Sequence, residues 1–189
     1  TLILTEGDSA KAMALSGLSA EQRKFYGVYP LKGKVLNVKD TSDAKVEHTK
    51  EIAELKKIIG LQSGKKYTDT STLRYGSVLI MTDQDYDGSH IRGLLINLFH
   101  ELWHELVAIP GFLTYMATPI VKATRGSAGA KGGAETKTFF SQYEYEVWRK
   151  GEGAKGWKVK YYKGLGTSTR DEAKEYFARP QAVQFTFVE

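Results

Sequence analysis

Short apolar segments alternate along this chain with longer stretches in which apolar residues recur at helical spacing. The apolar or alternating segments have the length of strands and are predicted as strands at 1–6, 25–31, 77–81, 113–122 and 157–162. The stretches with helical spacing are predicted as helices at 8–18, 47–59, 89–107, 144–150 and 170–178. Because strands and helices alternate, we expect an α/β fold with a mostly parallel sheet flanked by helices.

Glycines and capping residues mark the ends of several of these segments. Asp8 or Ser9 is placed to cap the first helix, while Thr169 and Glu172 have the spacing of a capping box before the last one. Residues 126–134 are rich in glycine and alanine, which predicts a flexible surface loop. Residues 163–168 are also rich in glycine and are predicted as a tight turn between a strand and a helix.

Acidic residues follow two of the predicted strands. Glu6 ends the first, and the second, at 77–81, is followed by Asp83, Asp85 and Asp87. The carboxyl ends of parallel strands lie at the edge of the sheet where α/β proteins bind ligands. Side chains two residues apart on extended backbone share a face, so the aspartates are expected to converge. Their repulsion favours a bound cation, oxygen-only ligands favour Mg²⁺, and Glu6 would allow a second ion.

The aspartate-rich segment also has simpler interpretations. It begins like an EF-hand calcium loop, which requires a glutamate at its twelfth position. Counted from Asp83 that position is Leu94, so the EF-hand interpretation fails. A solvated surface turn remains an alternative for the aspartates alone, and Asp8 is predicted as a helix cap rather than a metal ligand.

Composition and charge indicate a folded protein that suits a polyanionic partner. Hydrophobic residues make up 41% of the chain, and no apolar run reaches the roughly 18 residues of a membrane span, so no membrane partner is expected. A net charge of +5 favours a polyanion, although ordinary solubility explains it equally well. The absence of cysteine excludes disulfides and thiolate chemistry. The chain opens on Thr1 without an initiator methionine, which is typical of an excised piece.

Four motifs stand in order along the chain. They are EGDSA at 6–10, PLKGKVLNV at 30–38, MTDQDYDGSHI at 81–91 and YKGLGTST at 162–169. Together they resemble the TOPRIM region of type II DNA topoisomerases, from residue 1 to about residue 177. The D-Q-D form, with GLLINLFH at 93–100 and IPGF at 109–112, is similar to the eukaryotic nuclear enzyme rather than to bacterial gyrase.

The resemblance implies a Rossmann-like TOPRIM fold and a part of the DNA cleavage and religation core of an ATP-dependent type II topoisomerase, an isomerase. It implies Mg²⁺ in a two-metal site, with Mn²⁺ or Ca²⁺ as substitutes, and ATP only in the full-length enzyme. The catalytic residues would be Glu6, Asp83 and Asp85, and these three with Asp87 would hold the metal. Double-stranded DNA as substrate, a homodimer in the full-length enzyme and a location in the nucleus are implied as well.

The resemblance also implies contacts with DNA, because the basic segment at 30–38 matches the DNA-contacting loop of the family. Lysine at position 32 stands where many relatives have arginine, and lysine lacks arginine's bidentate geometry toward phosphate. The residues expected at DNA are Lys32, Lys34, Asn37, His90, Arg92, Lys163 and Gly164. A structural role for His90 and a simple tight turn at 163–164 remain equally good interpretations. Lys56, Lys57, Lys65 and Lys66 are expected on solvated surface.

By the same resemblance the chain divides into three stretches. Residues 1–122 would form the TOPRIM core, 123–178 a C-terminal α+β extension, and 179–189 the start of a connection to a winged-helix domain. The family's cleavage tyrosine lies on that winged-helix domain, so the 189 residues alone are not expected to cleave DNA.

Other functions stay open from the sequence. A TOPRIM domain of a primase or a nuclease would share the acids but should lack the PLKGK and KGLGTS motifs. A non-catalytic, Mg²⁺-dependent DNA-binding scaffold would use the same residues without cleavage. A phospho-acceptor domain, in which an aspartate is phosphorylated, would leave the basic segment at 30–38 unexplained.

Overall fold

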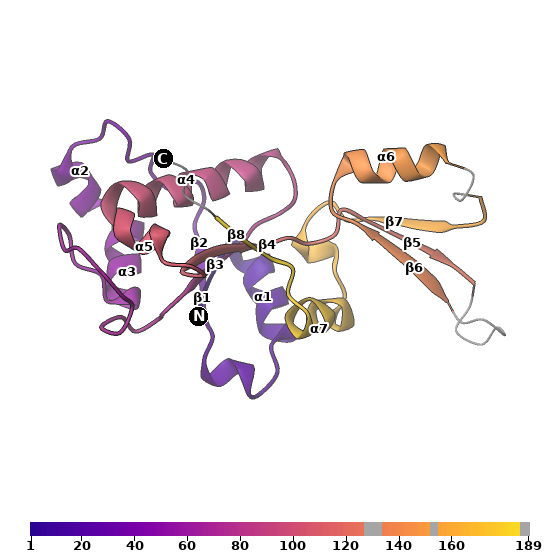
Figure 1. Cartoon of the computed structure of the whole chain (residues 1–189), viewed down its shortest axis with the longest axis horizontal. Coiled ribbons are helices and arrows are strands. Elements are labelled where there is room, and N and C mark those ends of the chain that lie inside the picture. Colours follow the sequence, from indigo (N-terminus) through magenta and orange to yellow (C-terminus); the bar gives the residue numbers. More distant parts are fainter. Residues whose placement is uncertain (127–133, 152–154, 186–189) are drawn as a thin grey trace.

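A five-stranded sheet forms the centre of the larger part of the molecule (Figure 1). The computed structural model describes residues 1–126, 134–151 and 155–185. The strand order is β2-β1-β3-β4-β8, and the strands are β1 (Leu2–Glu6), β2 (Gly27–Leu31), β3 (Val78–Met81), β4 (Leu113–Met116) and β8 (Ala182–Gln184). The first four are parallel and β8 runs antiparallel to β4. The prediction of an α/β fold with a mostly parallel sheet is confirmed.

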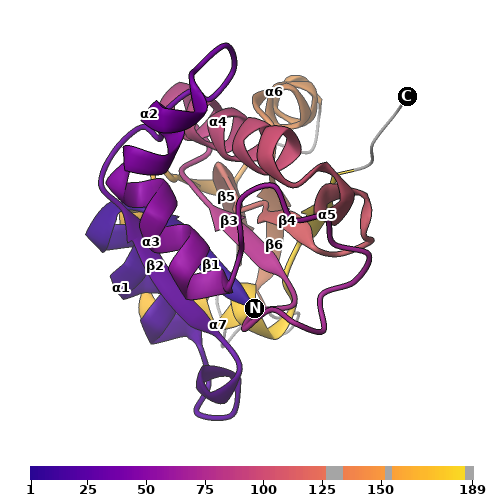
Figure 2. The same ribbon diagram turned by 90° about the vertical axis from the view of Figure 1, so that its left-hand side faces the viewer.

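Helices cover both faces of this sheet, as the end-on view shows (Figure 2). One face carries α3 (Lys50–Ile59), α4 (Tyr86–Leu102) and α5 (His104–Ala108), with α2 (Asp43–His48) beside them, and the other carries α1 (Gly7–Gly17) and α7 (Arg170–Ala178). Side chains of successive strand residues point to opposite faces of the sheet. Leu4 packs with the first group of helices, and Ile3 packs with the second. Burial on both faces explains why the strands are almost continuously apolar.

An aromatic cluster breaks the helix that was predicted at 89–107. The ring of Phe99 lies 6.0 Å from that of Trp103 and 5.9 Å from that of Phe112. The Trp103 indole N–H also donates to the Gln62 carbonyl at 3.0 Å, and Trp103 leaves helical geometry with φ −147° and ψ 60°. The single predicted helix is therefore two helices, α4 and α5, because this tertiary contact holds Trp103 outside both.

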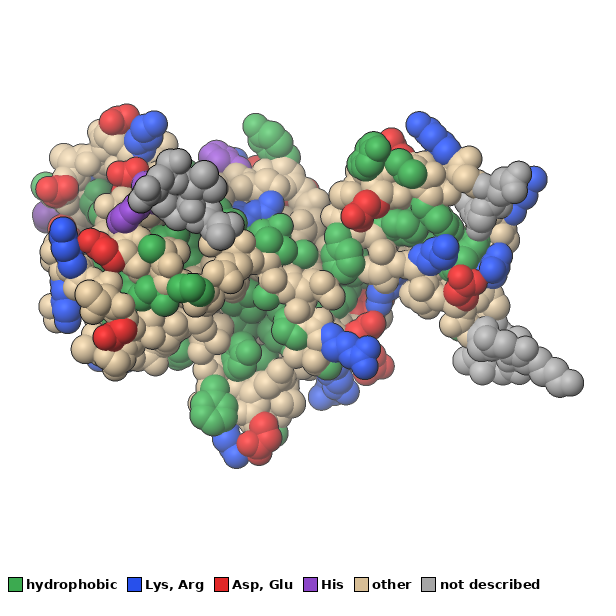
Figure 3. All heavy atoms as spheres, viewed as in Figure 1, with side chains coloured by type: hydrophobic (Ala, Val, Ile, Leu, Met, Phe, Trp, Pro, Cys, Tyr) green, Lys and Arg blue, Asp and Glu red, His purple; other side chains and the backbone are tan. Residues whose placement is uncertain are grey.

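The smaller part contains a three-stranded antiparallel sheet of order β6-β5-β7 with α6 (Gln142–Lys150) on one face. Its strands are β5 (Val121–Arg125), β6 (Glu135–Phe139) and β7 (Lys158–Tyr161). Figure 3 shows the two parts joined by a narrower waist. This sheet is the predicted C-terminal α+β extension. The predicted loop at 126–134 lies largely outside the described residues.

Two predictions about strands are wrong. The strand predicted at 113–122 is two strands, β4 and β5, which belong to different sheets and have Pro119 between them. Strands β6 and β8 were not predicted at all. Their residues are mostly exposed, so they lack the apolar run of a buried strand.

Helix α7 joins the two parts. It begins with the predicted capping box of Thr169 and Glu172, and buries Ala173, Tyr176 and Phe177 against the larger part. On its other side, Glu172 and Glu175 form ion pairs with Lys160 and Lys122 of the smaller sheet, both at 3.0 Å. The short 3₁₀ helix η3 (Leu165–Thr167) precedes α7, and another, η1 (Gln22–Lys24), follows α1. No helix within the described residues is long and apolar enough to cross a membrane.

Candidate functional site

Glu6 and Asp83 meet at the carboxyl edge of the parallel sheet. Glu6 is the last residue of β1, and Asp83 lies two residues beyond β3, which pairs directly with β1. The backbone N–H of Asp83 donates to Glu6 Oε2 at 3.1 Å. Both residues are half-buried. The structure therefore places these two acids at one edge of the sheet, as predicted.

The carboxylate of Asp83 also contacts the glycine-rich turn at 163–168. Its Oδ1 accepts a hydrogen bond from the Leu165 backbone N–H at 2.7 Å. A Cβ atom at Gly164 would lie 2.5 Å from Asp83 Oδ2, closer than any real contact of this kind. Gly164 was predicted to contact DNA, and the turn was also open to a purely structural interpretation. In this structure its glycine allows the backbone to approach Asp83.

Asp85 and Asp87 do not continue the extended backbone that was expected. Asp85 is the N-cap of α4, and its Oδ1 accepts from the Gly88 N–H at 2.8 Å. Asp87 lies in the first turn of the helix, where its Oδ1 pairs with Lys34 Nζ at 2.9 Å. The idea that the three aspartates share one face is wrong beyond Asp85, because the helix begins at Tyr86.

Asp8 was predicted to cap the first helix, and this is also wrong. The helix begins one residue earlier, at Gly7, so Glu6 occupies the N-cap position without a side-chain cap bond. Asp8 lies in the first turn instead, exposed to solvent. An acid there still interacts favourably with the positive end of the helix dipole.

The negative charges of these acids repel one another, and a bound cation would reduce that repulsion. Burial raises the pKa of Glu6, and Asp83, Asp85 and Asp87 raise it further, against the lowering effect of the Asp83 N–H. Within the described ranges, no group of three or more His, Cys, Asp or Glu side chains is arranged to hold one metal ion. Mg²⁺ is often held by only one or two carboxylates, with waters and substrate phosphates completing its shell. The donor pair of Glu6 and Asp83 fits such an ion.

A groove of about 640 Å³ lies where three of the acids meet the basic segment at 30–38. Its lining includes Glu6, Asp8 and Asp87 together with Lys32 and Lys34. Lys34 lowers the pKa of Asp87 through its hydrogen bond and charge. Acids that suit a cation and lysines that suit phosphate therefore line one open hollow.

The remaining residues predicted at DNA are distributed differently. Asn37 accepts hydrogen bonds from the Asn97 side chain at 3.3 Å and from the Lys39 N–H at 3.2 Å, which ties the basic segment to α4. Arg92 stacks on the Tyr115 ring at 4.3 Å, on the β4 side of the sheet. His90 is exposed in the first turn and a half of α4, and Lys163 lines a separate hollow beside Gln84. The structure therefore brings only Lys32 and Lys34 into the groove with the acids.

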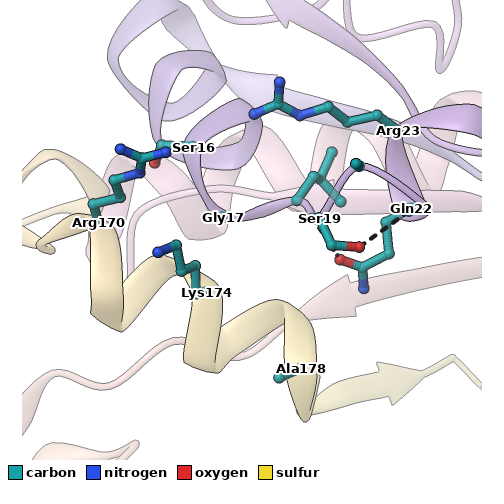
Figure 4. A pocket seen from close by; sticks show the side chains of 10 residues that line it. Ser16, Gly17, Ser19, Gln22, Arg23, Arg170, Lys174 and Ala178 are labelled. Atoms are coloured by element: carbon teal, nitrogen blue, oxygen red, sulfur yellow. Dashed lines mark hydrogen bonds between the residues drawn. The ribbon is translucent and has the colours of Figure 1, made fainter.

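Another hollow, of about 880 Å³, lies between the C-terminal end of α1 and helix α7 (Figure 4). Arg23, Arg170 and Lys174 line it, but no acid does. Arg23 Nη2 is engaged by the Leu15 carbonyl at 2.5 Å, and Gln22 bonds to Ser19. Since the acids stand at the other end of α1, this hollow is separate from the candidate metal site.

Sequence reasoning missed the residues that brace the turn beside Asp83. Glu172 was identified as part of a capping box, but its carboxylate also accepts the Tyr162 hydroxyl and pairs with Lys160. Burial works to raise the pKa of Glu172, yet the hydrogen bonds from Tyr162, Thr169 and Lys160 outweigh it and lower that pKa to about 2. The capping-box spacing was the one signal for this residue in the sequence.

Glu172 is expected to make the stability of the fold depend on pH in the acid range. Its pKa is lowered from 4.5 to about 2, so its contribution is complete above pH 4.5 and is lost as the pH falls toward 2. Urea unfolding should show that the chain has a higher free energy of unfolding than Glu172→Gln. The difference between the two proteins should shrink as the pH falls from about 5 to about 3. A difference that keeps its size over this range would contradict the assignment.

Comparisons with known proteins show the family and the fold of this chain. A family model described as "Toprim domain" matches residues 1–112, and one described as "C-terminal associated domain of TOPRIM" matches residues 116–189. A crystal structure of the Plasmodium falciparum topoisomerase II DNA-binding, cleavage and re-ligation domain has a TM-score of 0.84 and 53% identity. The match covers 94% of this chain and 23% of that one.

Two curated relatives are DNA topoisomerases 2. DNA topoisomerase 2 from Arabidopsis thaliana is 54% identical over 181 residues, and human DNA topoisomerase 2-beta is 53% identical over 182 residues. These matches cover 94% of this chain but only 12% and 11% of the two relatives. The Toprim model matches more than half of the chain, so the chain belongs to the Toprim domain family, and its similarity to DNA topoisomerase 2 extends over 94% of its length.

Proposed function

We propose that this chain is the Mg²⁺-binding part of the DNA cleavage and religation core of an ATP-dependent type II DNA topoisomerase. The observation that carries the proposal is the pair of Glu6 and Asp83 at the ends of neighbouring parallel strands, joined by a hydrogen bond of 3.1 Å, with Glu6 lining a groove that Lys32 and Lys34 also line. Relatives of about 50% identity that bear the name DNA topoisomerase 2 support the reaction class.

The acids would divide the work of holding metal in a two-metal site. Glu6 and Asp83 would hold one ion, Asp83 and Asp85 a second, and Asp87 would act through water. When bound, Mg²⁺ would stabilise charge on the scissile phosphate and on the ribose 3′-oxygen, with Mn²⁺ or Ca²⁺ as substitutes. Glu6 and Asp83 are half-buried, which limits water around their carboxylates and strengthens their attraction for a cation.

Lys32 and Lys34 would hold the DNA backbone over the acids. The pair of Lys34 and Asp87 is half-exposed, with 51% and 64% of the side chains accessible, so it stabilises the fold little. Lys34 can therefore exchange Asp87 for a phosphate at small cost. Contacts of this kind position DNA without reading its sequence.

The whole protein's activity extends this proposal. Double-stranded DNA would be the substrate, the working enzyme would be a homodimer in the nucleus, and both the cleavage tyrosine and the ATP site would lie outside these residues. We also propose that residues 1–122 act as the metal-holding core and 123–178 as an extension that completes it.

Lys34→Ala is expected to weaken DNA binding because one phosphate contact is lost. The slope of log affinity against log salt concentration should fall by about one unit. Lys57→Ala removes an exposed lysine from α3, outside the groove, and serves as the control that keeps the original slope. The measurement is fluorescence anisotropy with duplex DNA over a series of salt concentrations. An unchanged slope for Lys34→Ala would show that this lysine is a solvated surface residue that makes no contact with DNA phosphate.

The proposed function is tested by a chimaera in which these residues replace the Toprim region of a full-length DNA topoisomerase 2. We expect the chimaera to relax supercoiled DNA when both ATP and Mg²⁺ are present. A folded, dimeric chimaera that binds DNA without ever cleaving it would overturn the proposal and favour a binding scaffold.

A further inference from the structure

The turn that follows β7 holds the Asp83 carboxylate between a backbone N–H and a glycine. Leu165 N–H donates to Asp83 Oδ1 at 2.7 Å, and Gly164 stands against Oδ2 with no room for a side chain. We call residues 162–165 the strap. Leu165 and Asp83 are 82 residues apart in sequence. Asp83 follows β3 of the larger sheet, whereas the strap follows β7 of the smaller one.

Tyr162 anchors the strap at its first residue. Its side chain is 9% exposed, and its backbone N–H donates to the Ile120 carbonyl at 2.9 Å. Its hydroxyl donates to Glu172 Oε1, and the Lys160 ammonium lies 4.6 Å from its ring centroid. Tyr162 is thus fixed at the backbone, at the ring and at the hydroxyl.

Glu172 makes several of the contacts that hold Tyr162 in place. It accepts from Thr169 N–H at 2.7 Å, pairs with Lys160 at 3.0 Å and receives the Tyr162 hydroxyl. Only 17% of its side chain is exposed, so these bonds are shielded from water. Because Glu172 lies in the first turn of α7, which packs on α1, it ties the strap to the core of the larger part.

We propose that Tyr162 and Glu172 are positioning residues that hold the strap, and through it the Asp83 carboxylate, in the orientation that binds metal. The inference deepens the proposed function and rests on it where Asp83 is taken as a metal ligand. A carboxylate with one oxygen held by a backbone N–H keeps a single rotamer and points its second oxygen in a fixed direction. Partners of this kind orient metal ligands and contribute measurably to metal affinity.

The neighbouring ion pair of Glu175 and Lys122 provides a matched control. It also joins α7 to the smaller sheet at 3.0 Å, but 66% of the Glu175 side chain is exposed, and among the described residues its carboxylate is hydrogen-bonded to Lys122 and not to the strap. Loss of this pair would disturb the attachment of the smaller part without releasing Tyr162. A general effect of that attachment would therefore appear in Glu175→Gln, whereas an effect of the strap would not.

The test uses Tyr162→Phe, Glu172→Gln and Glu175→Gln in the 189-residue chain. Hydrogen exchange of the Leu165 amide, followed by NMR without metal, reports the strap, and electron paramagnetic resonance with Mn²⁺ reports metal affinity. We expect Tyr162→Phe and Glu172→Gln to speed Leu165 exchange by about tenfold and to weaken Mn²⁺ binding by about tenfold, with Glu175→Gln within about twofold of wild type.

Each outcome decides between the strap and its alternatives. Unchanged Leu165 exchange and Mn²⁺ affinity in folded Tyr162→Phe or Glu172→Gln would overturn the inference, as would equal losses in Glu175→Gln. If wild type binds no Mn²⁺ even with duplex DNA present, but Leu165 exchange responds as expected, the strap still positions Asp83 and the proposed metal site fails. Tyr162→Phe keeps the buried ring, so it remains informative if Glu172→Gln fails to fold.

Discussion

Replacing Asp83 by asparagine is expected to lower Mg²⁺-dependent DNA cleavage by on the order of 10³-fold in the topoisomerase chimaera. Asparagine keeps the Oδ1 atom that accepts from Leu165 and the backbone N–H that donates to Glu6, so the strap and the strand ends stay in place. What is lost is the charge that a divalent cation requires.

Cleavage and DNA binding should respond to this change differently. Duplex binding by Asp83→Asn should stay close to wild type, since the lysines of the groove are untouched. Asp8→Asn is the control, because Asp8 lines the same groove but lies exposed in the first turn of α1. If Asp83→Asn cleaved DNA as well as the wild type at any Mg²⁺ concentration, Asp83 would not be a metal ligand.

Replacing Gly88 by alanine is expected to destabilise the fold by about 3 kcal/mol. A Cβ atom at this position would lie 2.0 Å from the Asp83 carbonyl oxygen and 2.9 Å from its carbonyl carbon. These are backbone atoms at the end of a buried strand, so they cannot turn away as a flexible side chain would. Because Gly88 has no Cβ atom, the first turn of α4 can pack directly against the backbone of Asp83.

Gly93→Ala provides the matched control within the same helix. A Cβ atom there meets nothing within 4 Å, and Gly93 is exposed, so alanine should stabilise α4 by about 0.5–1 kcal/mol. Urea unfolding of both variants measures the two effects, which have opposite signs. A Gly88→Ala protein as stable as wild type would show that the end of β3 is less tightly packed against α4 than the structure indicates.

The pattern of apolar residues was sufficient for the elements that are buried on both sides. It identified β1 and β3, whose residues are apolar almost throughout, and α7, whose capping box appears in the structure as predicted. It did not identify β6, because the ETKTF segment is largely solvated and carries no apolar alternation. Nor did it separate β4 from β5, since one extended run can pass from one sheet to another without a change of pattern.

The candidate site was predictable in its residue types and only in part in its geometry. Glu6 and Asp83 were placed correctly because parallel strands end at one edge. The helix start at Tyr86, which turns Asp87 toward Lys34, and the bond from Leu165 to Asp83 were not predictable. The Leu165 bond and the Lys34–Asp87 pair join segments that meet only in the folded chain, so local spacing does not show them. The start of α4 has a local signal, the Asp85 cap on Gly88, which the prediction of a helix from residue 89 missed.

The most direct test of the metal site is a crystal of this chain with duplex DNA and Mn²⁺, examined for anomalous density. The account predicts a peak at direct ligand distance from both Glu6 and Asp83, with the Leu165 N–H still bonded to Asp83 Oδ1. A crystal with bound DNA and well-ordered carboxylates but no Mn²⁺ peak at these two residues would contradict it.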